Sequence, residues 1–156
     1  EAAGGSAKQF RVRVTDLALQ IDPPFETDHC GSCTRCLEAC PTGAFVEPRV
    51  LDATRCISYV TIEQKGLIPP EIADRLSGWA FGCDICNEVC PWNQRFSMPS
   101  EIPAFHPRSE LDDADRDHFE DMDEAEFWRR FGDTALARPG LANMRRNWSA
   151  AWRSLP

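Results

Sequence analysis

The sequence has no run of the roughly 18 apolar residues that a membrane-spanning helix requires, so we expect no such helix. Its first ten residues, EAAGGSAKQF, contain neither the basic stretch nor the apolar stretch of a secretory signal peptide. The chain is 42% hydrophobic and 27% charged, which is too apolar for wholesale disorder. We therefore expect a globular protein that works in the cytoplasm, as a monomer and away from membranes. The sequence also lacks an initiator Met and ends abruptly at WRSLP, which indicates a piece of a longer protein.

Histidine and positive charge are scarce too. The three histidines, His29, His106 and His118, are expected to be bystanders. A formal net charge of −8 argues against a nucleic-acid footprint over the whole surface. Acids concentrate in residues 109–126, whereas residues 128–156 hold six arginines against one acid. Either two solvated helix faces carry opposite charge, or the basic end of the chain lies near a polyanion.

Cysteine, by contrast, is plentiful, and its eight copies need an explanation. A disulfide framework is disfavoured because the chain has no secretory signal and exceeds the size of most disulfide-stapled scaffolds. Residues 30–41, CGSCTRCLEACP, separate four cysteines by two, two and three residues and end in proline. This is the bacterial ferredoxin run, in which three thiolates bind one [4Fe–4S] cluster and the fourth binds another. Pro41 then stops the chain from continuing as a helix.

A second, shorter run predicts where the other cluster lies. Residues 83–91, CDICNEVCP, repeat the last three cysteines and the proline, and the isolated Cys56 can supply the missing ligand. Exchange of the fourth ligands then completes two sets and uses all eight cysteines. The predicted first cluster has the ligands Cys30, Cys33, Cys36 and Cys90, and the predicted second cluster has Cys56, Cys83, Cys86 and Cys40. Two structural zinc ions are the alternative.

Residues close to the two runs are expected to support the clusters. Backbone N–H groups and hydroxyls that donate hydrogen bonds to the sulfurs would tune the cluster potentials. The candidate donors are Gly31, Ser32, Gly43, Ser58 and Gly82. Trp92 and Asn93, directly after the second run, are expected to pack over a cluster.

The rest of the sequence predicts short elements. We expect a strand over 10–14, a helix over 34–39, and a two-stranded ribbon over 43–51 with its bend at Glu47–Pro48. Further helices are expected over 52–63, capped by Asp52 or Thr54, and over 69–76 and 85–89. Residues 91–107 hold four prolines and are predicted to be an extended linker. Two helices follow, over 121–131 and from Leu141 onward; in the second, an apolar stripe is formed by Leu141, Met144, Trp148 and Trp152.

Together these segments predict an α+β fold. A bacterial-type two-cluster ferredoxin-like domain would be followed by the start of an α-helical, HEAT-like repeat region, because two helices alone cannot bury so much aromatic surface. The predicted boundaries are 1–24 for the end of an upstream domain, 25–96 for the ferredoxin-like domain, 97–120 for a Pro-rich and acidic linker, and 121–156 for the first repeat helices.

Two segments carry a more specific resemblance. RCISYVTIEQKGLIP (55–69) and GCDICNEVCPWN (82–93) resemble the iron–sulfur half of the epoxyqueuosine reductases, which are cobalamin-dependent enzymes of queuosine biosynthesis. The likeness is strong over residues 10–100 and continues weakly through FWRRFGDTALARPGLANMRRNW (127–148). It implies reduction of epoxyqueuosine to queuosine at a tRNA wobble position, with two electrons and two protons consumed and water released. It also implies the same eight cluster ligands, with the second cluster nearer the cobalamin.

The resemblance further implies which parts lie elsewhere. The family's cobalamin-binding domain and acidic proton donor are upstream of this sequence, so we predict no catalytic residue here and expect the chain alone to be inactive. Arg145 and Arg146 match basic positions where the family's repeats meet tRNA, so they are predicted phosphate contacts. The sequence does not identify the electron donor.

Two other functions would also use the clusters. A stand-alone ferredoxin-type electron carrier accounts for the cysteines but leaves the helical tail without a role. The iron–sulfur tail of a reductive dehalogenase, another cobalamin enzyme, has a similar two-cluster domain, but those proteins are usually exported and membrane-associated. Salt-sensitive binding of tRNA would separate the first function from both alternatives.

Overall fold

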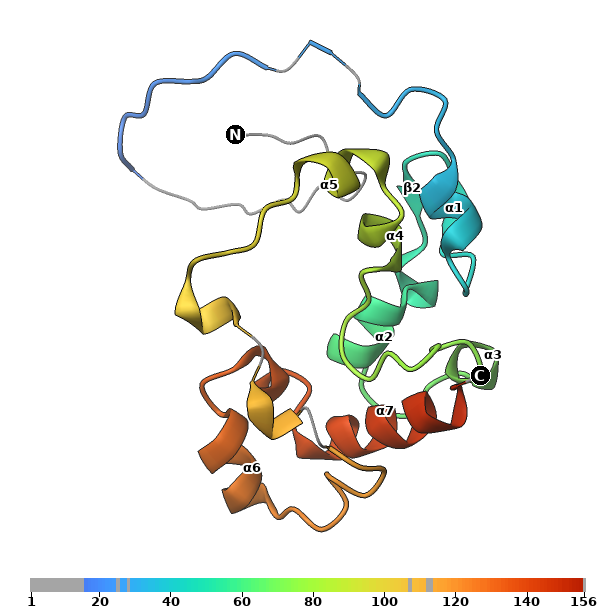
Figure 1. Cartoon of the computed structure of the whole chain (residues 1–156), viewed down its shortest axis with the longest axis vertical. Coiled ribbons are helices and arrows are strands. Elements are labelled where there is room, and N and C mark those ends of the chain that lie inside the picture. The colour runs from blue at the N-terminus through green and yellow to red at the C-terminus, as the bar shows by residue number, and fades with distance from the viewer. Residues whose placement is uncertain (1–15, 25, 28, 107, 112–113, 156) are drawn as a thin grey trace.

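Short helices joined by tight turns make up most of the chain (Figure 1). The computed structural model describes residues 16–155 apart from 25, 28, 107, 112 and 113, so the strand expected over 10–14 lies outside the described residues. The helices are α1 (Arg35–Ala39), α2 (Ile57–Ile62), α3 (Pro70–Ala73), α4 (Ile85–Glu88), α5 (Pro91–Phe96), α6 (Glu124–Phe131) and α7 (Leu141–Arg153). Strands β1 (Phe45–Glu47) and β2 (Val50–Leu51) form an antiparallel hairpin. Single 3₁₀ turns are η1 (Ala53–Arg55), η2 (Pro103–Phe105), η3 (Ser109–Leu111) and η4 (Ala135–Ala137).

The two cysteine runs fold alike, as their repeated spacing predicts. Each has a short helix, α1 or α4, that ends at a Cys–Pro pair, and the two helices are in contact. Cys40 (φ −70°, ψ 112°) and Cys90 (φ −70°, ψ 119°) are both extended. The physical reason is that a proline ring excludes the helical conformation from the residue before it. The helix over 34–39 and the ribbon that bends at Glu47–Pro48 are confirmed.

Three predicted elements differ from the structure. Residues 52–63 divide into η1, which Asp52 caps through the Thr54 N–H, and α2, which begins after Cys56. The helix after Pro69 ends at Ala73 rather than Leu76. The start of the expected linker, from Pro91 to Phe96, is the helix α5. Proline was treated there as a helix breaker, although at the first position of a helix its fixed φ favours the helix.

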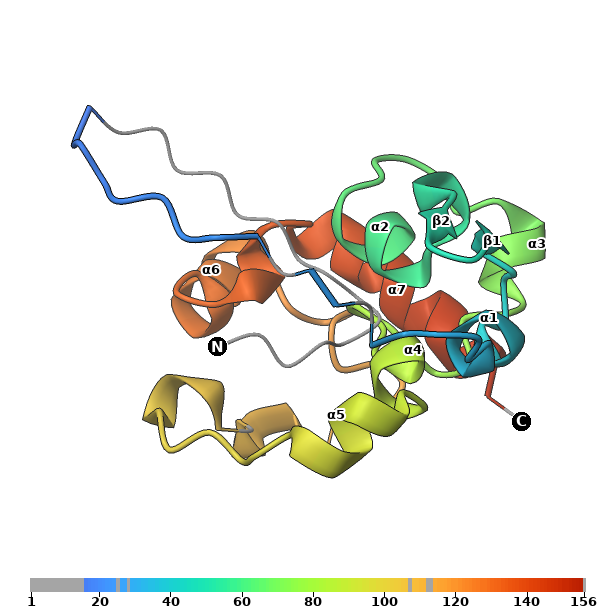
Figure 2. The same cartoon turned by 90° about the horizontal axis from the view of Figure 1, so that it is seen from above.

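One hydrophobic core lies beneath the cysteine runs. It consists of side chains from α2 and α3 and the turns after them, joined by a residue of α7: Ile57, Val60, Ile68, Ile72, Leu76 and Ala150. Figures 1 and 2 both draw α7 alongside α2, and these helices are in contact. The ferredoxin-like domain and the C-terminal helix therefore share a core, although the sequence placed them in separate domains.

A second core is aromatic and lies between α6 and α7. Its buried members are Phe119, Met122, Phe127, Phe131, Leu141 and Met144. Phe119 lies within the predicted acidic linker of 97–120, and Met122 lies two residues after it. Acidic residues surround both, so the sequence did not mark them as core residues. Phe119, Phe127 and Phe131 are buried in this core, whereas Trp128 is 51% and Trp152 39% exposed. That α6 and α7 begin a HEAT-like repeat stays a prediction.

The apolar stripe predicted for α7 is graded in burial. Leu141 and Met144 are buried, Trp148 is half-buried, and Trp152 is 39% exposed. Asn147 and Ala151, outside the predicted stripe, are buried as well. The buried face of α7 is thus wider than the stripe of large apolar residues, because the helix contributes to both cores.

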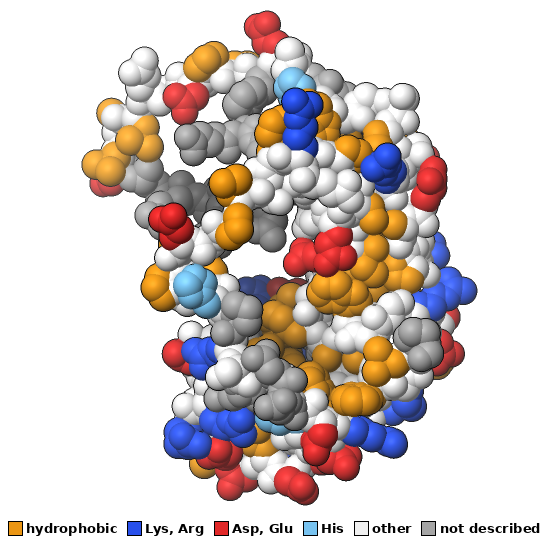
Figure 3. All heavy atoms as spheres, in the orientation of Figure 1, with side chains coloured by type: hydrophobic (Ala, Val, Ile, Leu, Met, Phe, Trp, Pro, Cys, Tyr) orange, Lys and Arg blue, Asp and Glu red, His pale blue; other side chains and the backbone are white. Residues whose placement is uncertain are grey.

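Charges of both signs are interspersed over the part of the surface that α6 and α7 form (Figure 3). Arg129 pairs with Glu126 at 2.6 Å, Arg138 with Glu63 at 2.7 Å, and Arg108 with Asp133 at 3.0 Å. Exposed pairs of this kind contribute little stability. None of the helices that the structure describes is long and apolar enough to cross a membrane.

Candidate iron–sulfur centres

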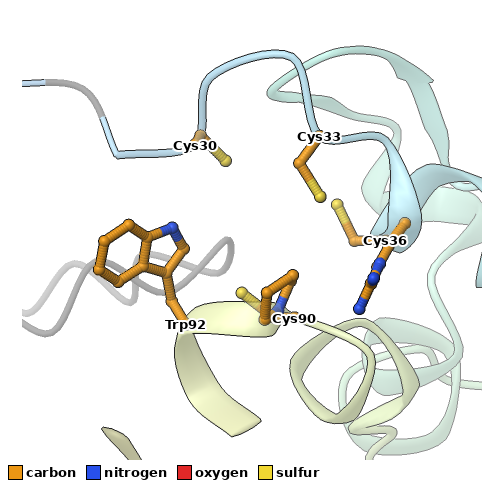
Figure 4. Close-up of a pocket in the computed structure, with 7 residues that line it drawn as sticks. Cys30, Cys33, Cys36, Cys90 and Trp92 are labelled. Carbon is orange, nitrogen blue, oxygen red and sulfur yellow. The ribbon is translucent and has the colours of Figure 1, made fainter. Parts of the chain in front are cut away.

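Four cysteines line one small cavity near the surface. Their sulfurs point toward a common space between the first cysteine run and α5 (Figure 4). The cavity measures about 40 Å³, and its lining includes Cys30, Cys33, Cys36 and Cys90 together with Trp92. These are the four cysteines that the sequence assigned to the first cluster. Cys90, which is distant in sequence, reaches the cavity because α4 packs on α1.

The backbone of the first run positions three of these thiols. Cys30 and Cys33 flank a tight turn in which the Cys33 N–H donates to the Cys30 carbonyl at 3.3 Å. Gly31 occupies this turn with φ +53°, a left-handed conformation that favours glycine. Cys36 follows on the first turn of α1. Spacings of two residues thus place successive sulfurs on one side of a turn and a short helix.

Trp92 closes one side of this cavity. Its indole Nε1 donates to the backbone carbonyl of His29 at 2.6 Å, next to Cys30. The His29 and Trp92 rings are 5.1 Å apart, and Phe96 stacks on Trp92 at 5.4 Å. The indole therefore ties the start of the first run to α5, and it lines the cavity.

The other four cysteines form a second group, in which Cys40, Cys56, Cys83 and Cys86 are all half-buried. Burial raises the pKa of the Cys83 thiol to about 11, and the charges of Cys86, Cys56 and Cys40 add to the shift. Burial likewise raises the pKa of Cys86, with contributions from Cys56 and from Cys36 of the first group. Cys83 thus has within electrostatic reach the three cysteines that the sequence placed with it. Crowded thiols release their protons when a metal binds, because the metal stabilises the thiolates.

Cys40 is the exception within this group. Burial alone would raise the pKa of its thiol, but hydrogen bonds from the Thr42 hydroxyl and the Ala44 N–H outweigh it and lower the pKa. The Ala44 nitrogen lies 3.3 Å and the Thr42 oxygen 3.5 Å from Cys40 Sγ. Neither donor is among those expected from the sequence, although Thr42 and Ala44 lie only two and four residues after Cys40.

Three of the predicted sulfur donors bond to other groups. The Gly43 N–H donates to the Cys40 carbonyl at 3.1 Å, and the other two bonds lie near Cys83. The Ser58 hydroxyl donates to the Cys83 carbonyl at 3.3 Å, and the Gly82 N–H donates to the Thr61 hydroxyl at 3.0 Å. Both bonds run between α2 and the segment that enters the second cysteine run. They hold the chain around Cys83 rather than its sulfur.

All eight cysteines are thiols rather than disulfides. In the part of the chain that the structure describes, no three His, Cys, Asp or Glu side chains converge where one metal ion could bind. The thiols of the first group are instead spread around a cavity. A donor set of four thiolates around a small space fits a [4Fe–4S] cluster, which takes one cysteine at each of its four irons.

Arg145 and Arg146, the predicted phosphate contacts, are hydrogen-bonded within the chain. The Arg145 guanidinium donates to the backbone carbonyls of Phe119 and Met122, and also to that of Glu120. Arg146 donates to the carbonyls of Val60, Gln64 and Gly66 and to the side chain of Asn147. The structure thus accounts for both arginines without a nucleic acid.

Comparison with known proteins also indicates an iron–sulfur domain. Residues 29–93 match the family model of the 4Fe-4S double cluster binding domain. The epoxyqueuosine reductase of Synechocystis sp. is 47% identical over 138 residues, which are 88% of this chain and 47% of that protein. That of Pseudomonas aeruginosa is 44% identical over 141 residues, which are 90% of this chain and 39% of that protein.

Solved structures agree with the sequence relatives. A crystal structure of epoxyqueuosine reductase with an epoxyqueuosine-modified tRNA-Tyr stem loop superposes with a TM-score of 0.76 at 37% identity. The match covers 85% of this chain and 34% of that one. The chain belongs to the epoxyqueuosine reductase family. It spans about half or less of the length of these family members, and the double-cluster domain is the part that carries its cysteines.

Proposed function

We propose that this chain is the electron-relay portion of an epoxyqueuosine reductase and that its eight cysteines bind two [4Fe–4S] clusters with exchanged fourth ligands. The observation that carries the proposal is the grouping of the cysteines. Cys90 lies with the first run around one cavity, and Cys40 lies within reach of Cys83 in the second group. Each cluster, when bound, supplies reversible one-electron transfer.

The chain itself provides the setting for that chemistry. Its turns and short helices hold four thiols in each group, and the second group is half-buried. The Ala44 N–H and Thr42 hydroxyl stabilise negative charge on Cys40, which favours metal binding there. Trp92 lines the cavity of the first group and anchors the loop that carries Cys30.

The proposed reaction of the whole protein is the reduction of epoxyqueuosine in tRNA to queuosine. Two electrons and two protons enter, the epoxide oxygen leaves as water, and a carbon–carbon double bond remains. Cobalamin would be bound mainly by the part of the family's enzymes that this chain does not span, and the electron donor would be a separate protein or reductant. The related crystal structure with a modified tRNA stem loop supports tRNA as the substrate. Cytoplasmic location and a monomeric state stay predictions.

The first experiment is a count of iron and acid-labile sulfide per chain after anaerobic reconstitution, with electron paramagnetic resonance of the reduced protein. We expect about eight irons, about eight sulfides and the signals of two interacting clusters. About two zinc ions per chain without visible absorbance would overturn the proposal in favour of structural zinc.

Paired substitutions test the ligand exchange. Cys30→Ser with Cys90→Ser removes two ligands of the same proposed cluster, so about four irons should remain. Cys30→Ser with Cys40→Ser is the matched control, because it removes one ligand from each proposed cluster and should destabilise both. If the exchange is wrong and each run serves its own cluster, the two double variants will show the opposite pattern.

Binding of tRNA separates the proposed enzyme from a stand-alone electron carrier. The full-length protein should bind epoxyqueuosine tRNA with an affinity that falls as salt rises. A protein that holds both clusters and binds no tRNA at low salt would be an electron carrier instead.

A further inference from the structure

Helix α2 contacts the second cysteine group at two separate places. Its first residue directly follows Cys56, one proposed ligand. At the second residue of the helix, the Ser58 hydroxyl donates to the carbonyl of Cys83, another proposed ligand, at 3.3 Å. The Thr61 hydroxyl accepts the N–H of Gly82, the residue before Cys83, at 3.0 Å. One short helix therefore begins directly after Cys56 and bonds to the backbone before and after the side chain of Cys83.

The Thr61 hydroxyl bonds both as a donor and as an acceptor. It donates to the Ile57 carbonyl at 2.7 Å, with the Ser58 carbonyl at 3.5 Å as a longer alternative, and its oxygen accepts the Gly82 N–H. Thr61 is 0% exposed, and its bond to Gly82 is partly buried. Gly82 has φ +69°, a left-handed conformation that directs the chain into Cys83 and that its N–H bond helps to hold. A change at Thr61 should therefore reach Cys83 through the backbone.

The C-terminal helix fixes Thr61 from the other side. The Asn147 side-chain amide, also 0% exposed, donates from Nδ2 to the Thr61 carbonyl at 2.6 Å. Its Oδ1 accepts from Arg146 Nη2 at 2.8 Å and Nε at 3.0 Å, which sets the orientation of the amide. A chain of buried and partly buried hydrogen bonds thus runs from α7 through Thr61 to the residue before Cys83.

We infer that Thr61 and Asn147 are positioning residues of the second centre, and that α7 sets the geometry of this centre from outside the double-cluster domain. The inference rests on the proposed two-cluster function. It gives the C-terminal helix a role in the redox chemistry, beyond its contribution to the hydrophobic cores. Since ligand geometry and nearby hydrogen bonds tune metal centres, the effect should appear in the reduction potential of one cluster only.

The first test replaces Thr61 in the reconstituted chain. Thr61→Val keeps the shape and removes the hydroxyl, and it should change the reduction equilibrium of the second cluster at least threefold, about 28 mV for a one-electron couple. The first cluster should keep its potential and its resonance signal. Thr61→Ser restores the hydroxyl and should restore the wild-type potential.

Thr134→Val is the matched control for this substitution. The Thr134 hydroxyl also donates to a backbone carbonyl, that of Phe131 at 2.7 Å, and accepts a backbone N–H, that of Leu136 at 3.1 Å. It lies between α6 and α7, away from the cysteines. Its loss should lower stability and leave both potentials unchanged.

A second pair of variants tests the contribution of α7. Asn147→Ala removes the bond to Thr61 and should shift the potential of the second cluster in the same direction as Thr61→Val. Asn143→Ala is the control on the same helix, because the Asn143 amide donates only locally, to the Pro139 carbonyl at 2.8 Å. The inference is overturned if Thr61→Val and Asn147→Ala leave the second cluster unchanged, or if they shift both clusters equally.

A readout that needs no cluster separates this inference from the proposed function. In the metal-free chain, the amide hydrogen of Gly82 should exchange at least about tenfold faster in Thr61→Val and in Asn147→Ala than in the wild type, because local opening becomes easier. Unchanged exchange would refute the positioning role of Thr61 and Asn147. If the wild-type chain fails to bind two clusters, the proposed function is refuted, but the exchange measurement still tests this positioning role.

Discussion

Replacing Arg146 by methionine tests whether this side chain is a structural brace. The arginine is predicted from the sequence as a phosphate contact, yet its guanidinium donates to the carbonyls of Val60, Gln64 and Gly66. Methionine retains most of the apolar stem and removes every donor. The variant should therefore lose stability without losing much of the packing around α7.

The size of the loss follows from which carbonyls are shielded from water. The bond to Gly66 is exposed, so water can replace it, whereas those to Val60 and Gln64 are partly buried. A hydrogen bond from a charged donor contributes ~1.5–3 kcal/mol net, so two of them amount to ~3 kcal/mol at the lower bound. The lower bound applies because burial disfavours the charged guanidinium, which is why the pKa of Arg146 is lowered. The midpoint of thermal unfolding should fall by ~6–12 °C.

The assay is denaturation under anaerobic conditions, followed by circular dichroism and tryptophan fluorescence. Arg153→Met is the matched control on the same helix, because Arg153 Nη1 bonds only to the exposed Ser149 hydroxyl at 2.6 Å. That variant should stay within ~0.5 kcal/mol of the wild type.

The competing role predicts a different result. If Arg146 contacts phosphate, Arg146→Met should leave the unfolding midpoint unchanged and lower the slope of log affinity against log salt for tRNA by ~0.9. An unchanged midpoint would refute the brace, whatever happens to tRNA binding.

Two further predictions concern single contacts elsewhere. Asp123→Ala removes the N-cap of α6, in which Asp123 Oδ1 accepts the Glu126 N–H at 2.8 Å, and should cost ~1 kcal/mol in the free energy of unfolding measured by denaturant titration. Asp123→Asn, which preserves an acceptor, should recover most of that loss, and equal losses in both variants would contradict capping. Trp92→Phe keeps the ring and removes the 2.6 Å bond to the His29 carbonyl, worth ~1 kcal/mol, so the first cluster should lose its visible absorbance ~5-fold faster in a chelator. Loss at the wild-type rate would contradict an anchoring role for the indole.

Local sequence rules predicted the parts of this protein that are set by neighbouring residues. The Cys–Pro pairs end α1 and α4 in extended cysteines, and the turn at Gly31 follows from the two-residue spacing of Cys30 and Cys33. Proline was harder to interpret. Pro91 keeps Cys90 extended after α4 and also begins α5, and only the first of these two effects was expected from the sequence.

Positions that depend on distant partners were harder to predict. Phe119 and Met122 are core residues inside an acidic stretch, and no local periodicity marks them. Asn147 and Thr61 are polar, so a rule that places polar residues outside misses that both are fully buried. Each can be buried because the other supplies a hydrogen-bond partner, and that pairing joins residues 86 positions apart.

The sequence by itself determined the number of cysteines and the two runs, and it predicted the exchange of the fourth ligands from spacing and from matching every thiol to a partner. Only the tertiary structure decided how the ligands are supported. It places α7 against α2, uses Arg146 as a brace and links Thr61 to Gly82. Such contacts arise when the chain folds back on itself, and their energy depends on shielding from water, which a linear sequence does not record.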